Sequence, residues 1–377
     1  MIYLAIFTLL GLIAVTIEFA IGTRTLKKLR DLPAARREPR PPRVSVIVAA
    51  RNEARKIEAA LQSLLRQDYA NIEFIVVEDR SDDETGVILD RMAGIKVVHI
   101  RELPKGWLGK NHAQQTGAGH ATGELLLFTD ADIHMEATVI GRAAQYLVTE
   151  RLDHLAIVPH LDMPGTVLNM FGGAFSLFFG FYAKPWKARD PKSSRHIGIG
   201  AFNLVRADAY RKIGGHEPLR MRPDDDMMLG KLVKKSGYRQ DLVLGDDLIK
   251  VEWYSSVPEL VRGLEKNSFA GLEYSLARLI AATIAQLLVF VWPLVAVVVT
   301  IGAVRWLNVG CVLTMAVLYL DNASFPGVKR WHAFALPVTT LFFLYIIWRA
   351  TLKTICNDGI DWRGTHYSLK ELRANRL

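Results

Sequence analysis

The stretch ELLLFTDAD, residues 124–132, is an apolar run that ends in two carboxylates, Asp130 and Asp132. Consecutive apolar residues between polar ones are typical of a strand that is buried on both faces. Such strands belong to parallel sheets, whose ligands bind beyond the carboxyl ends of the strands. The stretch therefore predicts an α/β fold with a binding site at its two acids.

Three further apolar runs predict strands of the same sheet. They are VSVIVAA (44–50), IEFIVVED (72–79) and IKVVHI (95–100), all short and rich in β-branched residues. Between the first two lies NEARKIEAALQSLLRQD (52–68), whose apolar residues recur at helical spacing. The alternation of strands and helices predicts a mostly parallel central sheet in a domain of residues 43–277.

Polar side chains follow the other strand ends as well. Arg51 and Glu53 come directly after the first strand, and Asp79 closes the second. A carboxylate in this place can accept hydrogen bonds from a nucleoside base or a ribose hydroxyl. Capping of the next helix is an alternative that explains Ser81 and Asp82, but it does not explain Asp79. Three strand ends that carry such groups predict one common site.

The same rim of the sheet offers groups for a metal and a diphosphate. Asp130 and Asp132 can hold a hard divalent cation that bridges a diphosphate. Asp-x-Asp alone is common in solvated loops, and its place after a buried strand favours the metal site. Lys110 lies in LPKGWLGKNHA (103–113), a glycine-containing loop that leads into a predicted helix. A lysine and a helix N-terminus suit a diphosphate, whereas Lys105 fits a basic surface loop equally well.

Three consecutive acids, Asp224, Asp225 and Asp226, open a further predicted helix. The helix dipole favours acids at this position, and at least one of them can act simply as a cap. A carboxylate near an anionic sugar nucleotide gains proton affinity, which suits a general base. Consecutive helical side chains point about 100° apart, so the three acids cannot all face the same acceptor.

Four other residues are weaker candidates. His134 and His216 can contact a metal or a phosphate, but lone histidines are more often satisfied within loops. Trp253 and Tyr254 can stack on a sugar or an acceptor, and anchoring at a membrane interface is an equal alternative.

Taken in order, the motifs resemble the family-two inverting nucleotide-sugar glycosyltransferases with a GT-A fold. They are VSVIVAARNEA, IVVEDRSDD, GKNHA, TGELLLFTDAD, GAFNLVRADAYRKIGGHE and DDDMMLG, and they cover about residues 43–277. The GGHE segment and the flanking apolar segments are similar to the membrane-bound branch that glycosylates lipids, near the ceramide, hopanoid and carotenoid glycosyltransferases. The resemblance implies a UDP- or GDP-linked sugar as donor, a lipid acceptor, and Mg²⁺ or Mn²⁺ as cofactor.

The resemblance also assigns a role to each candidate residue. Substrate binding falls to Arg51, Glu53, Asp79, Lys110 and Asp130, of which Glu53 and Asp79 contact the nucleoside, Lys110 the diphosphate and Asp130 the ribose or sugar. Asp132 would bind the metal, Asp226 would deprotonate the acceptor hydroxyl, Asp225 would orient the acceptor, and Asp224 would cap the helix.

The sequence departs from the family pattern in two places. Asp225 stands where glutamate is usual, and no Gln-x-x-Arg-Trp element follows it, because residues 261–267 read VRGLEKN. Processive polymer synthases carry the Arg-Trp element. Its absence favours transfer of a single sugar.

An apolar segment precedes the predicted domain. Residues 1–23 carry one charge, Glu18, and are long enough to cross a hydrocarbon core of ~30 Å as a helix. Basic residues follow this segment rather than precede it, which favours an uncleaved anchor over a signal peptide. Residues 24–42 form a basic juxtamembrane linker. By the positive-inside rule the linker predicts a cytoplasmic catalytic domain.

A second membrane region of two to three segments is predicted for residues 278–352. Residues 279–304 carry no charge and are long enough to span, while 306–320 and 333–348 are shorter. Three crossings would place the basic tail, residues 353–377, outside, whereas its charge favours the inside, so the number of crossings stays open.

A shorter apolar run, MFGGAFSLFFGFYAKPW (170–186), lies within the predicted domain. It predicts either a helix in the membrane interface or a buried core helix.

The amino-acid composition and the net charge exclude some classes of function. The chain has 377 residues, half of them hydrophobic, and a net charge of +9 that lies largely in the basic flanks of apolar segments, so no nucleic-acid partner is predicted. Two cysteines, Cys311 and Cys356, exclude a disulfide framework.

The sequence thus predicts an inverting, metal-dependent hexosyltransferase of the inner cell membrane, multi-pass, that moves one sugar to a lipid or lipid-linked hydroxyl. The alternatives are a polysaccharide or polyprenyl-phosphate sugar synthase of the same fold, and a non-catalytic membrane scaffold.

Overall fold

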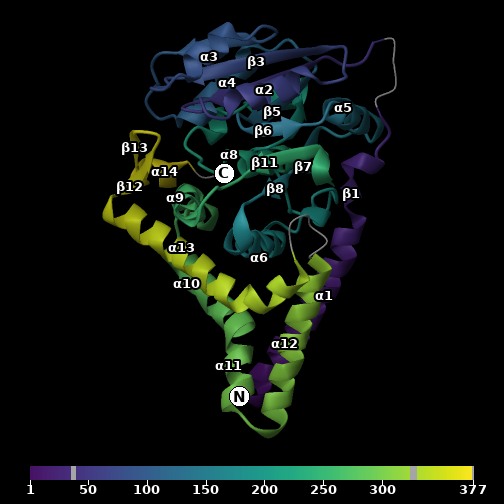
Figure 1. The fold of residues 1–377 in the computed structure, drawn as a ribbon, viewed down its shortest axis with the longest axis vertical. Helices are drawn as coiled ribbons and strands as arrows, with labels where there is room; N and C mark the ends of the chain where they lie inside the picture. The colour runs from purple at the N-terminus through teal and green to yellow at the C-terminus, as the bar shows by residue number, and fades with distance from the viewer. Residues whose placement is uncertain (35–39, 323–328, 376–377) are drawn as a thin grey trace. The chain divides into compact units, whose positions relative to one another are not determined.

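The computed structural model describes residues 1–34, 40–322 and 329–375 (Figure 1). Arg36, Arg37 and Glu38 of the predicted basic linker lie outside these ranges, as does Arg376 of the predicted tail.

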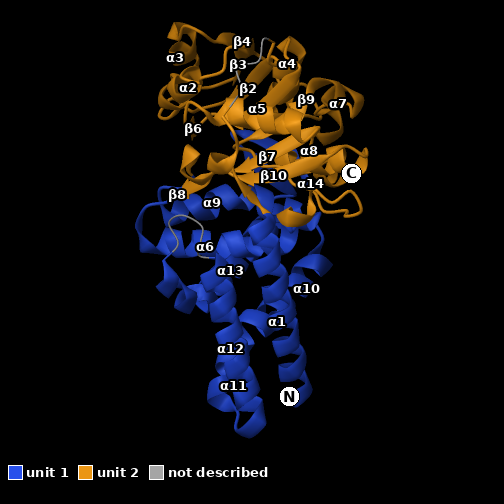
Figure 2. Cartoon of the chain, turned by 90° about the vertical axis from the view of Figure 1, so that its right-hand side faces the viewer, with its two compact units in different colours: residues 1–25, 162–184, 253–369 blue, residues 26–161, 185–252, 370–377 orange. Residues whose placement is uncertain are grey.

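The chain forms two compact units, neither of which is continuous in sequence (Figure 2). Unit 1 comprises residues 1–25, 162–184 and 253–369 and contains the long apolar helices. Unit 2 comprises residues 26–161, 185–252 and 370–377 and contains the central sheet and the predicted site residues other than the weaker candidates Trp253 and Tyr254.

Unit 2 is built on an eight-stranded sheet (Figure 1). In spatial order its strands are β1 (Lys27–Lys28), β10 (Gln240–Leu244), β7 (His154–Val158), β9 (Asn203–Arg206), β5 (Leu125–Asp130), β2 (Val44–Ala50), β3 (Ile72–Asp79) and β4 (Lys96–Ile100). All neighbours pair in parallel except β9, which runs antiparallel to both β5 and β7. The predicted α/β fold with a mostly parallel sheet is therefore confirmed.

The core of unit 2 consists of the aliphatic side chains that the sequence places on these strands. Val46, Ile75 and Leu127 from three adjacent strands are fully buried. The helices of this unit are α2 (Ile57–Leu65), α3 (Thr85–Arg91), α4 (Gly109–His120), α5 (Val139–Thr149), α7 (Ala207–Lys212) and α8 (Asp225–Lys235). Of these, α4 packs on β2 and β3.

Two element boundaries differ from the sequence prediction. The helix predicted from residue 52 begins only at Ile57, because Asn52 adopts a left-handed conformation with φ 55° and a turn follows it. The strand predicted for 124–132 ends at Asp130. Asp132 lies in a tight turn before β6 (Ile133–Met135), which pairs with β11 (Ile249–Glu252) in a second, three-stranded sheet with β8 (His160–Asp162).

Unit 1 holds the apolar helices α1 (Ile2–Thr25), α6 (Gly165–Ala183), α10 (Leu276–Gln286), α11 (Trp292–Val299), α12 (Gly302–Asn322) and α13 (Leu336–Cys356). It also holds the polar helix α9 (Val257–Ser268) and a hairpin of β12 (Gly359–Trp362) and β13 (Thr365–Ser368). A π-helix, Leu287–Val291, joins α10 to α11. By length and composition, five helices of the described residues could cross a membrane: Ile2–Thr25, Gly165–Lys187, Leu276–Val299, Gly302–Asn322 and Arg330–Cys356.

The apolar segment predicted as 279–304 does not continue to residue 304. The chain turns at Thr300 and Ile301, and α12 begins at Gly302 with φ 59°. The second predicted segment is therefore longer than expected from residues 306–320. The run at 170–186 forms α6, a helix of 19 residues.

The first residues after α1 belong to the sheet. Lys27 and Lys28 form the edge strand β1, and Leu29 is fully buried. Lys27 Nζ lies 3.0 Å from a Glu150 carboxylate oxygen, and Arg30 Nε lies 3.0 Å from one of Asp246. The start of the basic juxtamembrane segment is thus ordered by ion pairs within unit 2.

Candidate active site

The loops after β2 and β3 are joined by hydrogen bonds. The side-chain oxygen of Asn52 accepts from the Asp82 N–H at 2.8 Å, and the Asn52 N–H donates to Ser81 Oγ at 3.1 Å. The Glu53 N–H donates to Thr85 Oγ1 at 2.8 Å. The two strand ends that carry the predicted nucleoside contacts therefore form one rigid rim.

Asp79 lies at this rim between two guanidinium groups. Its side chain is buried and accepts from Arg80 Nε at 2.8 Å, while an Arg51 guanidinium nitrogen lies 3.9 Å away. Arg51 Nε is buried and has no hydrogen-bond partner among the residues that the structure describes. A buried donor without a partner is costly. This donor is therefore well suited to a bound nucleoside.

Lys110 lies between the acids at the end of β5 and those at the start of α8. From the first turn of α4 its Nζ lies 2.7 Å from Asp130 Oδ1 and 3.6 Å from Asp225 Oδ2. Burial opposes the charge, but the carboxylates of Asp130, Asp225 and Asp226 outweigh it and raise the pKa of Lys110. Lys110 is therefore a fixed cation between the end of β5 and the start of α8.

Asp132 lies in a region of excess negative charge. Burial and the nearby carboxylates of Asp130 and Glu53 raise the pKa of Asp132 to about 6. Lys56 opposes this shift, with its Nζ 3.7 Å from Asp132 Oδ2 and 3.0 Å from the Glu252 carbonyl oxygen. Sequence reasoning missed Lys56, although it lies only three residues after Glu53 in the same loop.

These residues fit a divalent cation that is shared with a ligand. Within residues 1–34, 40–322 and 329–375, no three His, Cys, Asp or Glu side chains converge to hold a metal by themselves. Mg²⁺ in proteins is commonly held by one or two carboxylates and completed by substrate phosphates and water. Asp132, with Asp130 two residues before it, supplies such an oxygen donor set. Burial, together with the carboxylates of Asp130 and Glu53, disfavours the charged form of Asp132 and raises its pKa, and a bound cation would stabilise that form.

Asp226 is positioned by main-chain donors. One carboxylate oxygen accepts from the Gly200 N–H at 2.8 Å and the other from the Met227 N–H at 2.8 Å. The Gly200 carbonyl in turn accepts from the Asp130 N–H at 3.1 Å. Burial and the Asp225 carboxylate raise the pKa of Asp226, and Lys110 opposes them. Gly200 therefore connects the end of β5 directly to Asp226.

The backbone around Gly200 packs directly on α8. A Cβ atom on Gly198 would overlap the carbonyl oxygen of Asp226, and one on Gly230 would overlap that of Ile197. Only glycine permits so close an approach of two backbones. Sequence reasoning did not single out this contact. The spacing of glycines in HIGIG (196–200) was the available signal.

Asp224 does not cap α8 with its side chain, so that prediction was wrong. It occupies the N-cap position, but its carboxylate accepts from Arg222 Nε at 2.8 Å and from a second guanidinium nitrogen at 2.7 Å. Arg222 is 1% exposed and requires a counter-charge, which explains why Asp224 turns toward it.

The weaker candidates have other surroundings. His216 is buried, its Nδ1 lies 2.7 Å from the Tyr210 hydroxyl, and burial lowers its pKa to about 3. His134 is exposed on β6. Trp253 belongs to unit 1, where its ring centre lies 4.6 Å from that of Phe175.

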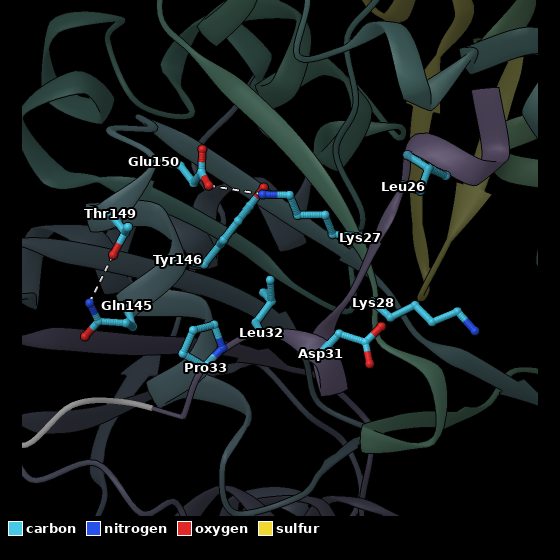
Figure 3. Close-up of a pocket in the computed structure, with 10 residues that line it drawn as sticks. All are labelled: Leu26, Lys27, Lys28, Asp31, Leu32, Pro33, Gln145, Tyr146, Thr149 and Glu150. Atoms are coloured by element: carbon cyan, nitrogen blue, oxygen red, sulfur yellow. Dashed lines mark hydrogen bonds and ion pairs between the residues drawn. The ribbon is translucent and has the colours of Figure 1, made fainter. Parts of the chain in front are cut away.

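A pocket of about 470 Å³ in unit 2 is not this site. It lies between the juxtamembrane segment and α5, and Figure 3 shows Lys27 directed toward Glu150 across it. Lys27 Nζ lies 4.7 Å from the centre of the Tyr146 ring. The pocket lining contains none of the predicted site residues.

Comparisons with known proteins agree with this geometry. Residues 45–214 match the family model described as Glycosyl transferase family 2. A 4,4'-diaponeurosporenoate glycosyltransferase from Staphylococcus aureus (strain MRSA252) is 22% identical over 368 residues, which cover 95% of this chain and 97% of the relative. The protein of that name from strain bovine RF122 / ET3-1 shows the same identity and coverage.

Among solved structures, the mannosyltransferase PcManGT from Pyrobaculum calidifontis, in complex with GDP-Man and Mn²⁺, aligns with a TM-score of 0.52 at 18% identity. The alignment covers 93% of this chain and 98% of that chain, and it shows the shared GT-A fold. The family match over residues 45–214 and the similarity to the staphylococcal 4,4'-diaponeurosporenoate glycosyltransferases support a family-two glycosyltransferase.

Proposed function

We propose that this protein transfers a single sugar, with inversion, from a UDP- or GDP-linked donor to a hydroxyl of a lipid or lipid-linked acceptor. The observation that carries the proposal is the position of Lys110 between Asp130 and Asp225. It places a cation suited to a diphosphate next to the acids suited to an acceptor. The name of the staphylococcal relatives, which specifies a carotenoid acid as acceptor, supports an apolar acceptor here.

The donor occupies the rim formed by β2, β3 and β5 in this proposal. Arg51, Glu53 and Asp79 bind the nucleoside, and Lys110 exchanges its contact with Asp130 for the diphosphate. Asp130 is then free to accept from a ribose or sugar hydroxyl. A divalent cation held by Asp132 would supply neutralisation of charge on the departing nucleotide diphosphate.

In this proposal the acceptor binds at the start of α8. The acceptor hydroxyl lies against Asp226, which takes its proton as the acceptor oxygen attacks the anomeric carbon. The bond from that carbon to the diphosphate breaks on the opposite side, so the configuration inverts. The raised pKa of Asp226 makes it a stronger base than an exposed aspartate. Asp225, which is 3% exposed and close to Lys110, holds this end of the site in place.

The proposal is tested with the full chain in lipid nanodiscs. UDP-glucose, UDP-N-acetylglucosamine and GDP-mannose are supplied in turn with a total lipid extract, and nucleotide release and lipid masses are measured. We expect one donor to give a lipid that carries a single added sugar. A ladder of additions would identify a polymer synthase instead, and no release from any donor would favour the non-catalytic scaffold.

We also propose a membrane topology, based on the segments that unit 2 contains. A folded polar unit lies on one side of a membrane. Between any two chain segments that belong to this unit, the chain therefore crosses the membrane an even number of times. Helix α6 is the single candidate span between residues 161 and 185, both in unit 2, so it does not cross. Three candidates among the described residues lie between residues 252 and 370, so at most two of them cross.

The hairpin of α10–α11 and α12 supplies these two crossings, because only Thr300 and Ile301 separate its arms. Helix α13 remains on the side of unit 2. It packs on α6, with Phe343 and Phe178 ring centres 5.1 Å apart, and Lys353 lies 2.7 Å from Glu265 of α9. With α1, the chain crosses three times.

An ion pair within unit 1 supports this topology. Arg24, at the end of α1, lies 2.6 Å from Asp321, at the end of α12. Both helices therefore end at the same membrane face. The basic residues that follow α1 favour the cytoplasm for that face.

Labelling of single cysteines tests the topology in intact cells. In a background without Cys311 and Cys356, a membrane-impermeant maleimide is expected to label Ile301→Cys but not Lys192→Cys or Gly271→Cys. All three are labelled after permeabilisation. A fluorescent protein fused after residue 377 is expected to behave as cytoplasmic. Labelling of Gly271→Cys from outside would contradict the cytoplasmic site, and labelling of Lys192→Cys would show that α6 crosses.

A further inference from the structure

The chain returns to unit 2 after its last apolar helix. Helix α14 (Leu369–Ala374) leads to Asn375, whose amide makes two hydrogen bonds to a segment more than 150 residues earlier. Its oxygen accepts from the Met221 N–H at 2.8 Å, and its nitrogen donates to the Pro218 carbonyl at 2.9 Å. Both polar ends of one side chain thus bind the main chain of a single loop.

The loop that Asn375 holds, residues 216–224, is also held by α4. Asn111, fully buried and adjacent to Lys110, donates to the Leu219 carbonyl at 2.6 Å and to the Arg222 carbonyl at 2.9 Å. The Leu108 N–H donates to the Arg220 carbonyl at 2.7 Å. Two asparagines from distant parts of the chain therefore fix the main chain of this loop.

The loop ends where the acceptor-side acids begin. Arg222 binds Asp224 through two hydrogen bonds, and Asp225 and Asp226 follow in the first turn of α8. A shift of the loop main chain therefore moves the start of α8. The residues proposed for the nucleoside lie at the ends of β2 and β3, and Lys110, proposed for the diphosphate, lies on α4, whereas the two side-chain hydrogen bonds of Asn375 go to Pro218 and Met221.

We propose that Asn375 is a positioning residue that sets the place of Asp226 through this loop. The inference rests on the proposed function, because it assigns Asn375 an effect on the acceptor step. Without the amide, the buried Met221 and its neighbours lose a fixed partner and the loop relaxes. A misplacement of 1 Å remote from the chemistry can cost about 100-fold in rate.

The test compares Asn375→Ala with Asn357→Ala in the full chain in nanodiscs. Asn357 is exposed in unit 1 and is therefore a matched control. Three quantities are measured: turnover by nucleotide release, affinity for UDP and GDP with Mn²⁺, and hydrogen exchange of residues 216–226. If the alanine variant does not accumulate, Asn375→Asp replaces it in the test. Aspartate keeps a side-chain oxygen that can accept from the Met221 N–H.

For Asn375→Ala we expect turnover to fall by about 10- to 100-fold, nucleotide affinity to stay within twofold, and exchange to accelerate in residues 216–226. Asn357→Ala is expected to match the wild type. Unchanged exchange overturns the inference, and so does faster exchange with unchanged turnover, which would show a purely structural clamp. Failure of the proposed function is distinguishable, because the wild type itself would then release no nucleotide.

Discussion

Replacing Asp226 with asparagine is expected to lower turnover by about 10²- to 10⁴-fold, the usual contribution of a general base. Asparagine keeps an oxygen that can accept from the Gly200 N–H, which Asp226 accepts at 2.8 Å, but it cannot take a proton from the acceptor. Affinity for the sugar nucleotide should change little, because the nucleoside contacts lie on other elements. Single-turnover rates and nucleotide titrations measure the two effects separately.

The neighbouring acids provide the controls. Asp224→Asn removes one counter-charge of buried Arg222, so it should destabilise the fold, read as a lower melting temperature. Its effect on turnover per folded molecule should be smaller than that of Asp226→Asn. If Asp226→Asn retains near-wild-type turnover while Asp225→Asn does not, the base is Asp225 and the assignment of Asp226 is wrong.

The pH dependence gives a second measure of the same group. A base acts in its deprotonated form, and burial and Asp225 raise the pKa of Asp226. Turnover should therefore fall as the pH decreases through this raised pKa, above the range of an exposed aspartate. The Asp226→Asn variant should lack this acidic limb.

Replacing Asp132 with alanine is expected to abolish transfer and to remove the response to added Mg²⁺ or Mn²⁺. The Asp132 carboxylate is the oxygen ligand proposed for a hard divalent cation. The cation would neutralise charge on the diphosphate as it leaves. Turnover measured against metal concentration, with and without EDTA, checks both parts. The variant should still fold, because removing Asp132 also removes its repulsion of Asp130 and Glu53.

Asp208 offers a matched control for this experiment. It is an exposed acid on α7, paired only loosely with Lys212 at 4.0 Å, so Asp208→Ala should leave the metal response intact. Full activity of the wild-type protein in EDTA would contradict metal dependence altogether.

The strands and their terminal acids were predictable because they are local features of the sequence. Buried parallel strands appear as short apolar runs, and the carboxyl end of each run locates its polar residues. This placed Asp79 and Asp130 at one rim. The contact between Lys110 and Asp225 was not predictable in this way. It depends on the segment that leads into β9, where the Gly200 N–H binds Asp226 and the backbone at Gly198 packs on the first turn of α8.

In both cases, Asp224 and Lys56, a partner that was not considered binds the side chain. The helix start suggested that Asp224 would cap, but the buried guanidinium of Arg222 binds its carboxylate more strongly. Lys56 likewise acquires its role only when the turn at Asp132 and the end of β11 approach it. Arg222 lies only two residues before Asp224, but local patterns do not reveal that it is buried. The contact of Lys56 with Glu252 joins residues 196 positions apart, so no local pattern reveals it.

The docking of Asn375 has a consequence for biogenesis. Translation produces this residue after the five apolar helices found among the described residues, so a nascent chain that already carries the strands of the eight-stranded sheet still lacks one clamp on the loop before α8. The site is therefore completed only after the hairpin of α10–α11 and α12 has left the ribosome. Proteolytic removal of Asn375 would accordingly loosen the loop before α8 in a chain whose other elements have already formed.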